Sequence, residues 1–308
     1  MTTGCSTTPG DYAPERDKAA IRTCAVRSRF VRQKAAGMRL EQRDEVLLCD
    51  LFLQRALSRS QIEELHFTST ARCNARLRLL FDHRFVERYF PPASPFGAQA
   101  VYTAGRAAVP VLSRRLEMDM TEVARLYRRG KTPTFIEHTL AIADVWLAFR
   151  RAAAKTPDID IERWLPEMQC RHEWEIRATG GGKWKKETFK PDGFIRLQAG
   201  NFEHCFFIEA DLGHTSSGQF ANKLATHIRY LESGLFEQTY GAHSFQTLVI
   251  TTGTRRLQNL KALAQKQGSR LFLFSCWEGV LSQSAILGPI WSAPFESRQI
   301  PIVSSAGR

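Results

Sequence analysis

The sequences KPDGFI at residues 190–195 and FFIEAD at residues 206–211 predict two neighbouring β-strands within a chain of 308 residues. Side chains alternate between the two faces of a strand, so Glu209 and Asp211 should share one face while apolar side chains occupy the other. Asp192 lies at the start of the first strand. Carboxylates are costly to bury without partners, so these three acids indicate a divalent-metal site, a neighbouring base, or solvated strand ends.

Helices and strands alternate around these two strands in the C-terminal half of the chain. Hydrophobic periodicity predicts a long helix at residues 135–154, strands near 167–177, 191–197 and 205–212, a helix near 219–233, a strand at 245–252, a helix at 254–266 and a strand at 270–276. The expected fold class of this half is therefore α+β or α/β.

Three short helices and a hairpin are expected in the N-terminal half. The helices are predicted at residues 41–57, from a capping box at Ser60 to Glu63 through residue 65, and from residue 69 or 70 to 82. The hairpin is predicted at residues 85–90 and 100–103. This order is typical of a winged helix-turn-helix, in which the third helix enters the major groove of DNA. A small helical dimerisation or packing module has the same pattern.

The outward face of the predicted third helix is rich in groups that contact DNA. Its apolar residues fall on one stripe, which leaves polar side chains on the opposite face and flanks. The candidate nucleic-acid-binding residues are Arg72, Asn74, Arg76 and Arg78 on this helix and Arg88 on the hairpin.

Composition favours a folded protein with a polyanionic partner. Hydrophobic residues make up 43% of the chain, which excludes wholesale disorder, and the formal net charge is +12 with a pI near 9.6. Such a charge favours nucleic acid through counterion release. The seven cysteines contain no CxxC pair and are interpreted as reduced thiols of a cytoplasmic protein, with no membrane span or signal peptide expected.

The same patterns divide the chain into segments. We expect a flexible basic arm at residues 1–38, a winged-helix DNA-binding domain at 39–108, connecting helices at 109–133, a second domain at 134–296 and a tail at 297–308. The basic residues of the arm are candidates for contacts along a phosphate backbone, and a solvated tail has the same composition.

The order of elements around the acids resembles the αβββαβ core of the PD-(D/E)xK nuclease superfamily. The resemblance implies a restriction-endonuclease-like domain in which Asp192 and Glu209 bind Mg²⁺ or Mn²⁺. The family places a catalytic lysine two residues after the glutamate, where this chain has Asp211. We therefore expect Asp211 to be a third metal ligand and Lys223, on the following helix, to supply the catalytic cation.

The two halves together resemble the replication-relaxation family of plasmids and other mobile genetic elements, over about residues 40–296. The resemblance implies a protein that binds double-stranded DNA and acts in replication, relaxation or transfer with other proteins of the element. Phosphodiester hydrolysis is one expectation. The alternative is a non-enzymatic regulator or assembly factor with an inactive nuclease fold, binding its element's DNA as a homodimer.

Other polar residues allow further interpretations. Glu137 is a candidate extra acid from the long helix, and its neighbour His138 is a candidate site, interface or packing residue. The glycines at residues 180–182 suggest a hairpin tip, since no phosphate-loop spacing surrounds them. RNA binding would be favoured if Trp174, Trp184 and the lysines at 183–186 faced one groove.

Overall fold

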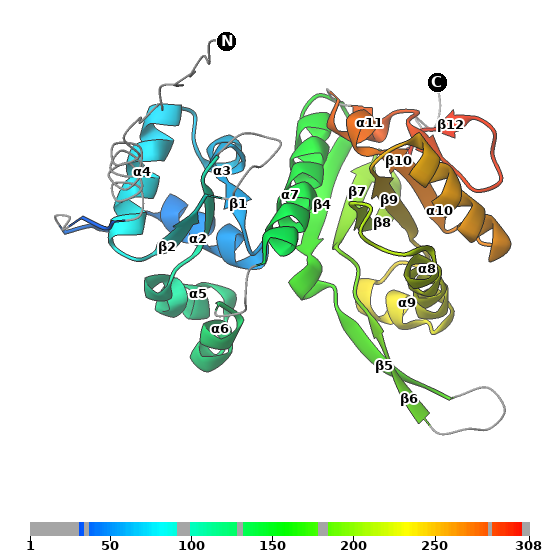
Figure 1. Ribbon diagram of the computed structural model, residues 1–308, viewed down its shortest axis with the longest axis horizontal. Coiled ribbons are helices and arrows are strands. Elements are labelled where there is room, and N and C mark those ends of the chain that lie inside the picture. Colours follow the sequence, from blue (N-terminus) through cyan, green and yellow to red (C-terminus); the bar gives the residue numbers. More distant parts are fainter. Residues whose placement is uncertain are drawn as a thin grey trace, which may run out of the picture.

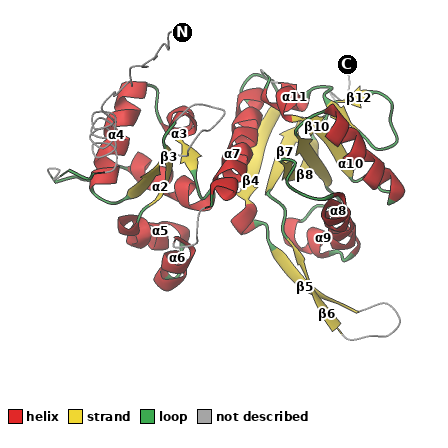
Figure 2. Ribbon diagram, viewed as in Figure 1, coloured by secondary structure: helices red, strands yellow, loops and turns green. Residues whose placement is uncertain are grey.

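The computed structural model describes residues 31–33, 37–90, 99–127, 132–177, 184–282 and 285–303, and it has a mixed α+β fold with one large mixed sheet. A group of helices with a small sheet lies on one side of the long helix α7, and the large sheet lies on its other side (Figure 1; Figure 2). No helix in the described part of the chain has the length and apolar character needed to cross a membrane.

The N-terminal group has the three helices and the hairpin that the sequence predicts. Its elements are α2 (Gln42–Leu53), β1 (Leu57–Ser58), α3 (Arg59–His66), α4 (Thr70–Asp82), β2 (Val86–Tyr89) and β3 (Val101–Ala104). The strands form an antiparallel sheet in the order β1-β3-β2. The sequence analysis missed β1, because a strand of two residues is too short to show a periodicity. The turn between β2 and β3, at residues 91–98, lies outside the described residues, as does most of the expected basic arm.

The capping box of α3 lies two residues earlier than predicted. Ser58 is the N-cap, since its Oγ accepts a hydrogen bond from the Gln61 backbone N–H at 3.2 Å while Gln61 Oε1 accepts from the Ser58 N–H at 2.9 Å. The expected pair, Ser60 and Glu63, lies inside the helix, where Glu63 forms an ion pair with Arg59. Two serines with acceptors three residues later compete as caps, and the extended backbone at Ser58 decides between them.

Apolar faces of the N-terminal helices form one core. The predicted stripe of α4 is confirmed, because Cys73, Leu77 and Leu80 are fully buried together with Leu47 and Leu51 of α2. Two helices, α5 (Val109–Leu116) and α6 (Met120–Tyr127), lie in the segment where the sequence predicted connecting helices, and they pack onto the same core, which the sequence did not predict.

Helix α7 (Pro133–Ala153) joins the N-terminal group to the large sheet. Thr132 caps it, with Oγ1 accepting from the Phe135 N–H at 3.2 Å, and Pro133 occupies its first turn. On one side, Ile136 of α7 packs against Ala56 and Val101 of the N-terminal group. On the other, Phe149 packs into the core of the large sheet. Helix α7 thus packs against both the N-terminal group and the large sheet.

The large sheet has seven strands in the order β12-β11-β10-β9-β8-β7-β4. Strands β8, β9 and β10 are parallel to one another, and the remaining neighbours are antiparallel. The strands are β4 (Ile159–Pro166), β7 (Gly193–Ala199), β8 (Phe202–Asp211), β9 (Gln246–Thr251), β10 (Phe272–Cys276), β11 (Trp291–Ser292) and β12 (Gln299–Ile300). The strands expected near 191–197, 205–212, 245–252 and 270–276 are confirmed.

The first strand of the sheet is a correction to the sequence analysis. The strand predicted at residues 167–177 is wrong as a member of the sheet, because β4 pairs with β7 instead. Residues 167–169 form a short 3₁₀ turn, and β5 (His172–Arg177) pairs with β6 (Trp184–Phe189) in a separate ribbon that projects from the body of the protein (Figure 1). Strand β4 is an edge strand whose alternation covers only residues 159–162 and is then broken by a register shift between Ile161 and Arg163, so the periodic run is short.

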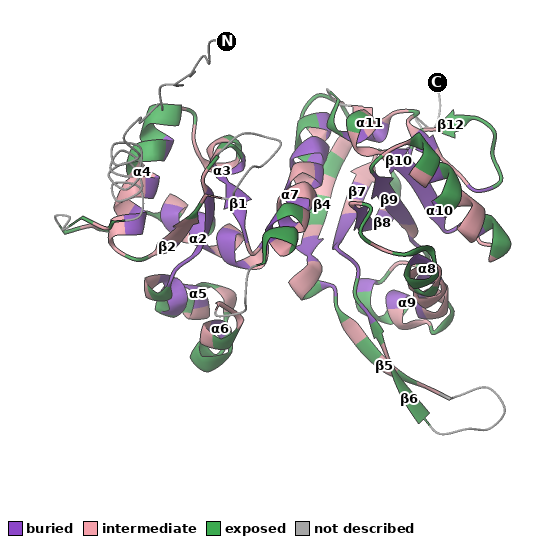
Figure 3. Ribbon diagram, viewed as in Figure 1, coloured by how far each residue is buried: buried purple, intermediate pink, exposed green. Residues whose placement is uncertain are grey.

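Helices cover both faces of the sheet, and many residues of its central strands are buried (Figure 3). Helix α7 and the short α11 (Trp277–Leu281) pack on one face. The other face is covered by α8 (Ser217–Glu232), α9 (Leu235–Tyr240) and α10 (Thr254–Lys266). Ile208 of β8 packs on the α7 side and Phe207 on the α8 side, which confirms the predicted alternation. Glu209 therefore faces α8.

Candidate functional site

Asp192 lies immediately before β7, where backbone contacts with β8 fix it. Its N–H donates to the Ile208 carbonyl at 3.0 Å, and its Oδ2 accepts from the Ala210 N–H at 2.8 Å. The residue is only 6% exposed. The antiparallel register of β7 and β8, which pairs Gly193 with Ile208, therefore brings the predicted aspartate beside the predicted glutamate.

Glu209 and Asp192 both lie close to the ammonium group of Lys223. Glu209, on β8, is 2% exposed, and its Oε2 forms an ion pair with Lys223 Nζ from α8. The same ammonium lies 3.8 Å from Asp192 Oδ2. The structure thus brings together Asp192, Glu209 and Lys223, the three residues that the sequence analysis named as catalytic candidates.

Charge and burial act in opposite directions on this cluster. Burial raises the pKa of Asp192, but Lys223 and the contact with His138 outweigh it and hold that pKa well below its usual range. Burial lowers the pKa of Lys223, whereas the two carboxylates raise it above its ordinary value. Asp192 and Lys223 are therefore both stabilised in their charged forms and are ionised at neutral pH.

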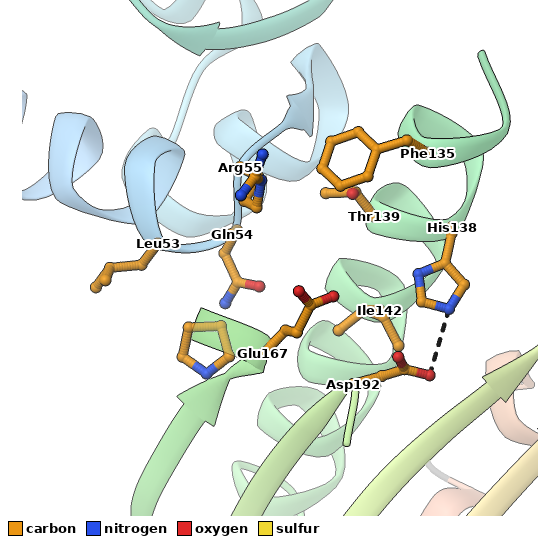
Figure 4. A pocket seen from close by; sticks show the side chains of 10 residues that line it. Leu53, Gln54, Arg55, Phe135, His138, Thr139, Ile142, Glu167 and Asp192 are labelled. Atoms are coloured by element: carbon orange, nitrogen blue, oxygen red, sulfur yellow. Dashed lines mark ion pairs between the residues drawn. The ribbon is translucent and has the colours of Figure 1, made fainter. Parts of the chain in front are cut away.

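His138 extends the cluster toward the N-terminal group. Its Nε2 lies 3.3 Å from Asp192 Oδ2, and Figure 4 shows the two side chains facing each other at one side of a pocket. Burial lowers the pKa of His138, yet the hydrogen bond and charge of Asp192 leave it raised above its usual value. The pocket is lined by Leu53, Gln54, Arg55, Phe135, His138, Thr139, Ile142, Pro166, Glu167 and Asp192. Residues of both halves of the chain therefore line the pocket that contains Asp192.

The sequence analysis missed a second histidine. His227 is buried on α8, one helical turn after Lys223, and its Nε2 lies 2.7 Å from Glu209 Oε1. Its Nδ1 lies 2.9 Å from Thr247 Oγ1 on β9. The four-residue spacing from Lys223 is the signal that could have identified it, since residues so spaced share a helical face.

Asp211 has a different environment from the one predicted. Arg256 of α10 donates through Nε to Oδ2 at 2.8 Å and through Nη2 to Oδ1 at 3.1 Å, and Thr251 Oγ1 donates to Oδ2 at 2.7 Å. Burial raises the pKa of Asp211, but these hydrogen bonds outweigh it and lower the pKa. Arg256 thus engages both oxygens of Asp211, so the predicted metal binding by this carboxylate would require the guanidinium to move away. Across the described ranges no group of three or more His, Cys, Asp or Glu residues is arranged to hold a metal ion.

Two carboxylates remain as potential ligands of a divalent cation. Mg²⁺ is usually bound by one or two protein carboxylates together with waters and substrate phosphates. Asp192 Oδ2 and Glu209 Oε2 both face the position of the Lys223 ammonium. The donor set therefore fits Mg²⁺ or Mn²⁺ if the ammonium moves aside.

The candidate DNA contacts on α4 divide into exposed and engaged side chains. Arg72 and Asn74 are exposed in the first half of the helix. Arg76 makes contacts within the protein, because its guanidinium binds the buried Asp44 through two nitrogens and donates to the Arg39 carbonyl at 2.9 Å.

The two remaining arginine candidates also make contacts within the protein. Arg78 donates through Nε to Asp82 Oδ2 at 2.8 Å and through Nη2 to the Val31 carbonyl at 3.2 Å. The Arg88 guanidinium lies over the Phe81 ring, 4.5 Å from its centroid. Both side chains are therefore held against the N-terminal group.

Other residues singled out in the sequence lie away from the cluster. Glu137 is exposed and lies 3.9 Å from His214. Trp174 packs against Tyr230, whereas Trp184 is exposed on the ribbon, so the two tryptophans do not share one groove. The glycines at residues 180–182 and Lys183 lie outside the described residues.

The chain was compared with family models, with curated proteins and with solved structures. A family model described as replication-relaxation matches residues 48–244. No curated protein matches the chain. A solved structure titled restriction endonuclease FokI aligns with 10% identity and a TM-score of 0.29, covering 82% of this chain and 45% of that chain. The chain thus spans less than half the length of that protein.

Proposed function

The chain belongs to the replication-relaxation family, and we propose that it is a DNA-binding protein of a mobile genetic element that hydrolyses phosphodiester bonds during replication, relaxation or transfer. The observation that carries this proposal is the contact of Lys223 with both Asp192 and Glu209. Two carboxylates can hold a divalent cation that activates water for phosphodiester cleavage, and a neighbouring lysine can stabilise the negative charge that develops. In this proposal the large sheet belongs to a PD-(D/E)xK-like domain in which the lysine has moved to the following helix.

Each group of the cluster has a separate role. Mg²⁺ or Mn²⁺, when bound, would polarise the phosphate and lower the pKa of a water. Asp192 and Glu209 would hold the cation, and the Ala210 N–H would fix the orientation of the Asp192 carboxylate. Lys223 would turn toward the phosphate, where its positive charge stabilises the negative charge that develops as the bond breaks. Its side chain is 36% exposed, so the ammonium has room to move toward solvent.

The N-terminal group supports duplex binding. Three helices followed by a β2–β3 hairpin, with β1 completing a three-stranded sheet, match the winged-helix order. In this proposal α4 enters the major groove with its first half, where Arg72 and Asn74 are exposed. The net charge of +12 adds a favourable electrostatic term for DNA.

The proposal also specifies compartment and partners. The described cysteines are free thiols, as expected of a protein that works in the cytoplasm. Double-stranded DNA is the proposed principal partner. Replication or transfer proteins of the same element and a second copy of the chain are proposed as further partners.

A cleavage assay tests the proposal. The purified protein is incubated with supercoiled and linear DNA, including DNA of its own element, in Mg²⁺, Mn²⁺ or EDTA. Asp192→Asn and Glu209→Gln are compared with the exposed Glu278→Gln as a matched control. Metal-dependent nicking by the wild type and the control, but not by the two site variants, is the expected result. Equal nicking by all four proteins would contradict the assigned site.

A non-enzymatic DNA-binding regulator is the second candidate. The observation that favours it is that Lys223 and His227 already satisfy the buried carboxylate of Glu209 without a metal. In that case the wild-type protein would slow the migration of DNA in a gel-shift assay but would leave the DNA uncut in both Mg²⁺ and Mn²⁺. Asp192→Asn would then change stability and leave DNA affinity unchanged.

A further inference from the structure

We propose that His227, held in turn by Thr247, is a positioning residue that fixes the Glu209 carboxylate so that only its Oε2 is presented to Lys223 and to a divalent cation. This inference rests on the proposed function for the cation, and its structural part concerns the described side chains alone. Thr247 lies on β9 and Asp192 lies just before β7, so the two flank β8, which carries Glu209, from opposite sides.

The contacts form a continuous chain from β9 to the candidate site. Thr247 Oγ1 lies 2.9 Å from His227 Nδ1, and His227 Nε2 lies 2.7 Å from Glu209 Oε1. A carboxylate accepts hydrogen bonds only, so Nε2 carries the proton and donates to Glu209. With the proton on Nε2, Nδ1 accepts a hydrogen bond from the Thr247 hydroxyl.

Aromatic rings keep the imidazole in this orientation. Phe189 packs edge-on against His227 with ring centroids 4.7 Å apart, and Phe272 lies on another side at 5.9 Å. Both His227 and Thr247 are fully buried. Rotation of the ring would place a polar nitrogen against apolar surface with no hydrogen-bond partner, which is unfavourable. The ring is therefore a rigid support for Glu209.

Helix α8 uses both oxygens of one carboxylate. Lys223 contacts Oε2 and His227 contacts Oε1 from adjacent turns of the helix. The histidine bond leaves Oε2 as the one oxygen of Glu209 available to a cation that replaces the ammonium. Hydrogen bonds from such outer partners orient metal ligands, and their loss typically weakens metal affinity by about 10- to 100-fold.

Two matched pairs of variants separate this role from simple packing. In His227→Gln the amide nitrogen can reach the position of Nε2, whereas in His227→Asn it reaches only the position of Nδ1, so Asn retains the Thr247 contact and loses the Glu209 contact. Thr247→Val removes the hydroxyl at nearly constant volume, and Thr247→Ser retains it. Thermal unfolding of each variant measures the accompanying change in stability.

The measurement is Mn²⁺ affinity of the full chain by calorimetry, without DNA, with Asp192→Asn as the control for binding at the site. The expected result is affinity about tenfold or more weaker in His227→Asn, weaker in Thr247→Val, and close to wild type in His227→Gln and Thr247→Ser. Equal affinity in the wild type and all four variants, with binding still lost in Asp192→Asn, would overturn the positioning role and leave the metal centre intact. Wild-type protein with no Mn²⁺ binding sensitive to Asp192→Asn would overturn the metal centre and the positioning role together.

Discussion

Lys223 on α8 forms an ion pair with Glu209 on β8, and its ammonium lies 3.8 Å from Asp192 Oδ2. A single positive charge thus stands between two buried negative charges at the start of β7 and near the end of β8. A metal-dependent nuclease needs such a pair of acids for its cation and a positive group beside the phosphate. The arrangement gives each of the three residues a distinct, testable role.

Arg256 should stabilise the fold without taking part in cleavage. Arg256→Met leaves the buried Asp211 carboxylate without its bidentate partner, so we expect the free energy of unfolding to fall by roughly 2 kcal/mol, below the cost for a fully buried pair because Arg256 is 20% exposed. Chemical denaturation measures this change. The exposed neighbour Arg255→Met is the control and should leave stability unchanged. An unchanged free energy of unfolding in Arg256→Met would contradict this structural role, and tighter Mn²⁺ binding in that variant would return Asp211 to the metal site.

Arg76 on α4 should contribute to the stability of the fold. Arg76→Ala leaves the buried Asp44 unpaired and should lower the free energy of unfolding by roughly 3 kcal/mol. Urea denaturation of the variant beside wild type tests this. An unchanged unfolding midpoint would contradict the structural role assigned to Arg76.

Arg72→Ala should weaken duplex binding at unchanged stability. An exposed arginine that contacts a phosphate contributes about one released counterion, so the slope of log affinity against log salt should decrease by about one. Fluorescence anisotropy of a labelled duplex over a range of salt concentrations measures the slope. Arg115→Ala on α5, away from α4, is the control. The same slope in Arg72→Ala and wild type would move the DNA contact away from the first half of α4.

The contact between α3 and α7 should depend on pH through Asp144. Its Oδ1 accepts from Gln61 Nε2 at 2.6 Å, and burial raises the pKa of this carboxyl above its usual 3.8. A raised folded-state pKa means that the group contributes stability below pH 3.8 that is lost as pH rises through the folded pKa. Asp144→Asn keeps the acceptor without the charge.

Asp144→Asn should therefore be more stable than wild type at neutral pH, and the difference should shrink as the solution is made acidic. Urea denaturation at a series of pH values measures it. Glu278→Gln, which removes an exposed charge on α11, is the control for general charge effects. A difference that grows on acidification would contradict the assigned direction of the Asp144 shift.

Ser58 rather than Ser60 should cap α3. Ser58→Ala removes the acceptor for the Gln61 N–H and should lower the free energy of unfolding by about 1 kcal/mol. Ser60→Ala removes a hydroxyl from inside the helix and should have a smaller effect. Thermal unfolding of the two variants gives the comparison, and a larger loss in Ser60→Ala would restore the cap predicted from sequence.

Strong periodicity made most of the fold predictable. The alternation in β8 placed Phe207 and Ile208 on opposite faces, and the apolar stripe of α4 placed Cys73 and Leu77 in the core, because both patterns are local. Strand β4 was missed because its alternation lasts only four residues before a register shift between Ile161 and Arg163 interrupts it. Strand β5 was assigned to the sheet because His172 and Trp174 bury against Tyr230, which gives a ribbon the pattern of a sheet strand.

The candidate site was predictable where the partners are close in the chain. Asp192, Glu209 and Lys223 lie on consecutive elements of one antiparallel pair and the helix after it, so topology alone brings them near one another. The partner of Asp211 comes from α10, after a further parallel strand, and a local pattern gives no sign of that pairing. The contact between Arg76 and Asp44 was not predicted either, because it joins two helices that are separate in sequence.

In the proposed reaction Lys223 and a divalent cation have different roles in cleavage, and the Lys223→Met variant is the sharpest test of this difference. Mn²⁺ affinity and the single-turnover rate of nicking are measured on the same preparation, with the exposed Lys155→Met as control. Without the competing ammonium, Mn²⁺ should bind at least as tightly as in the wild type, while nicking should slow by about 100-fold or more. Nicking by Lys223→Met at the wild-type rate would contradict the assignment of Lys223 to the reaction.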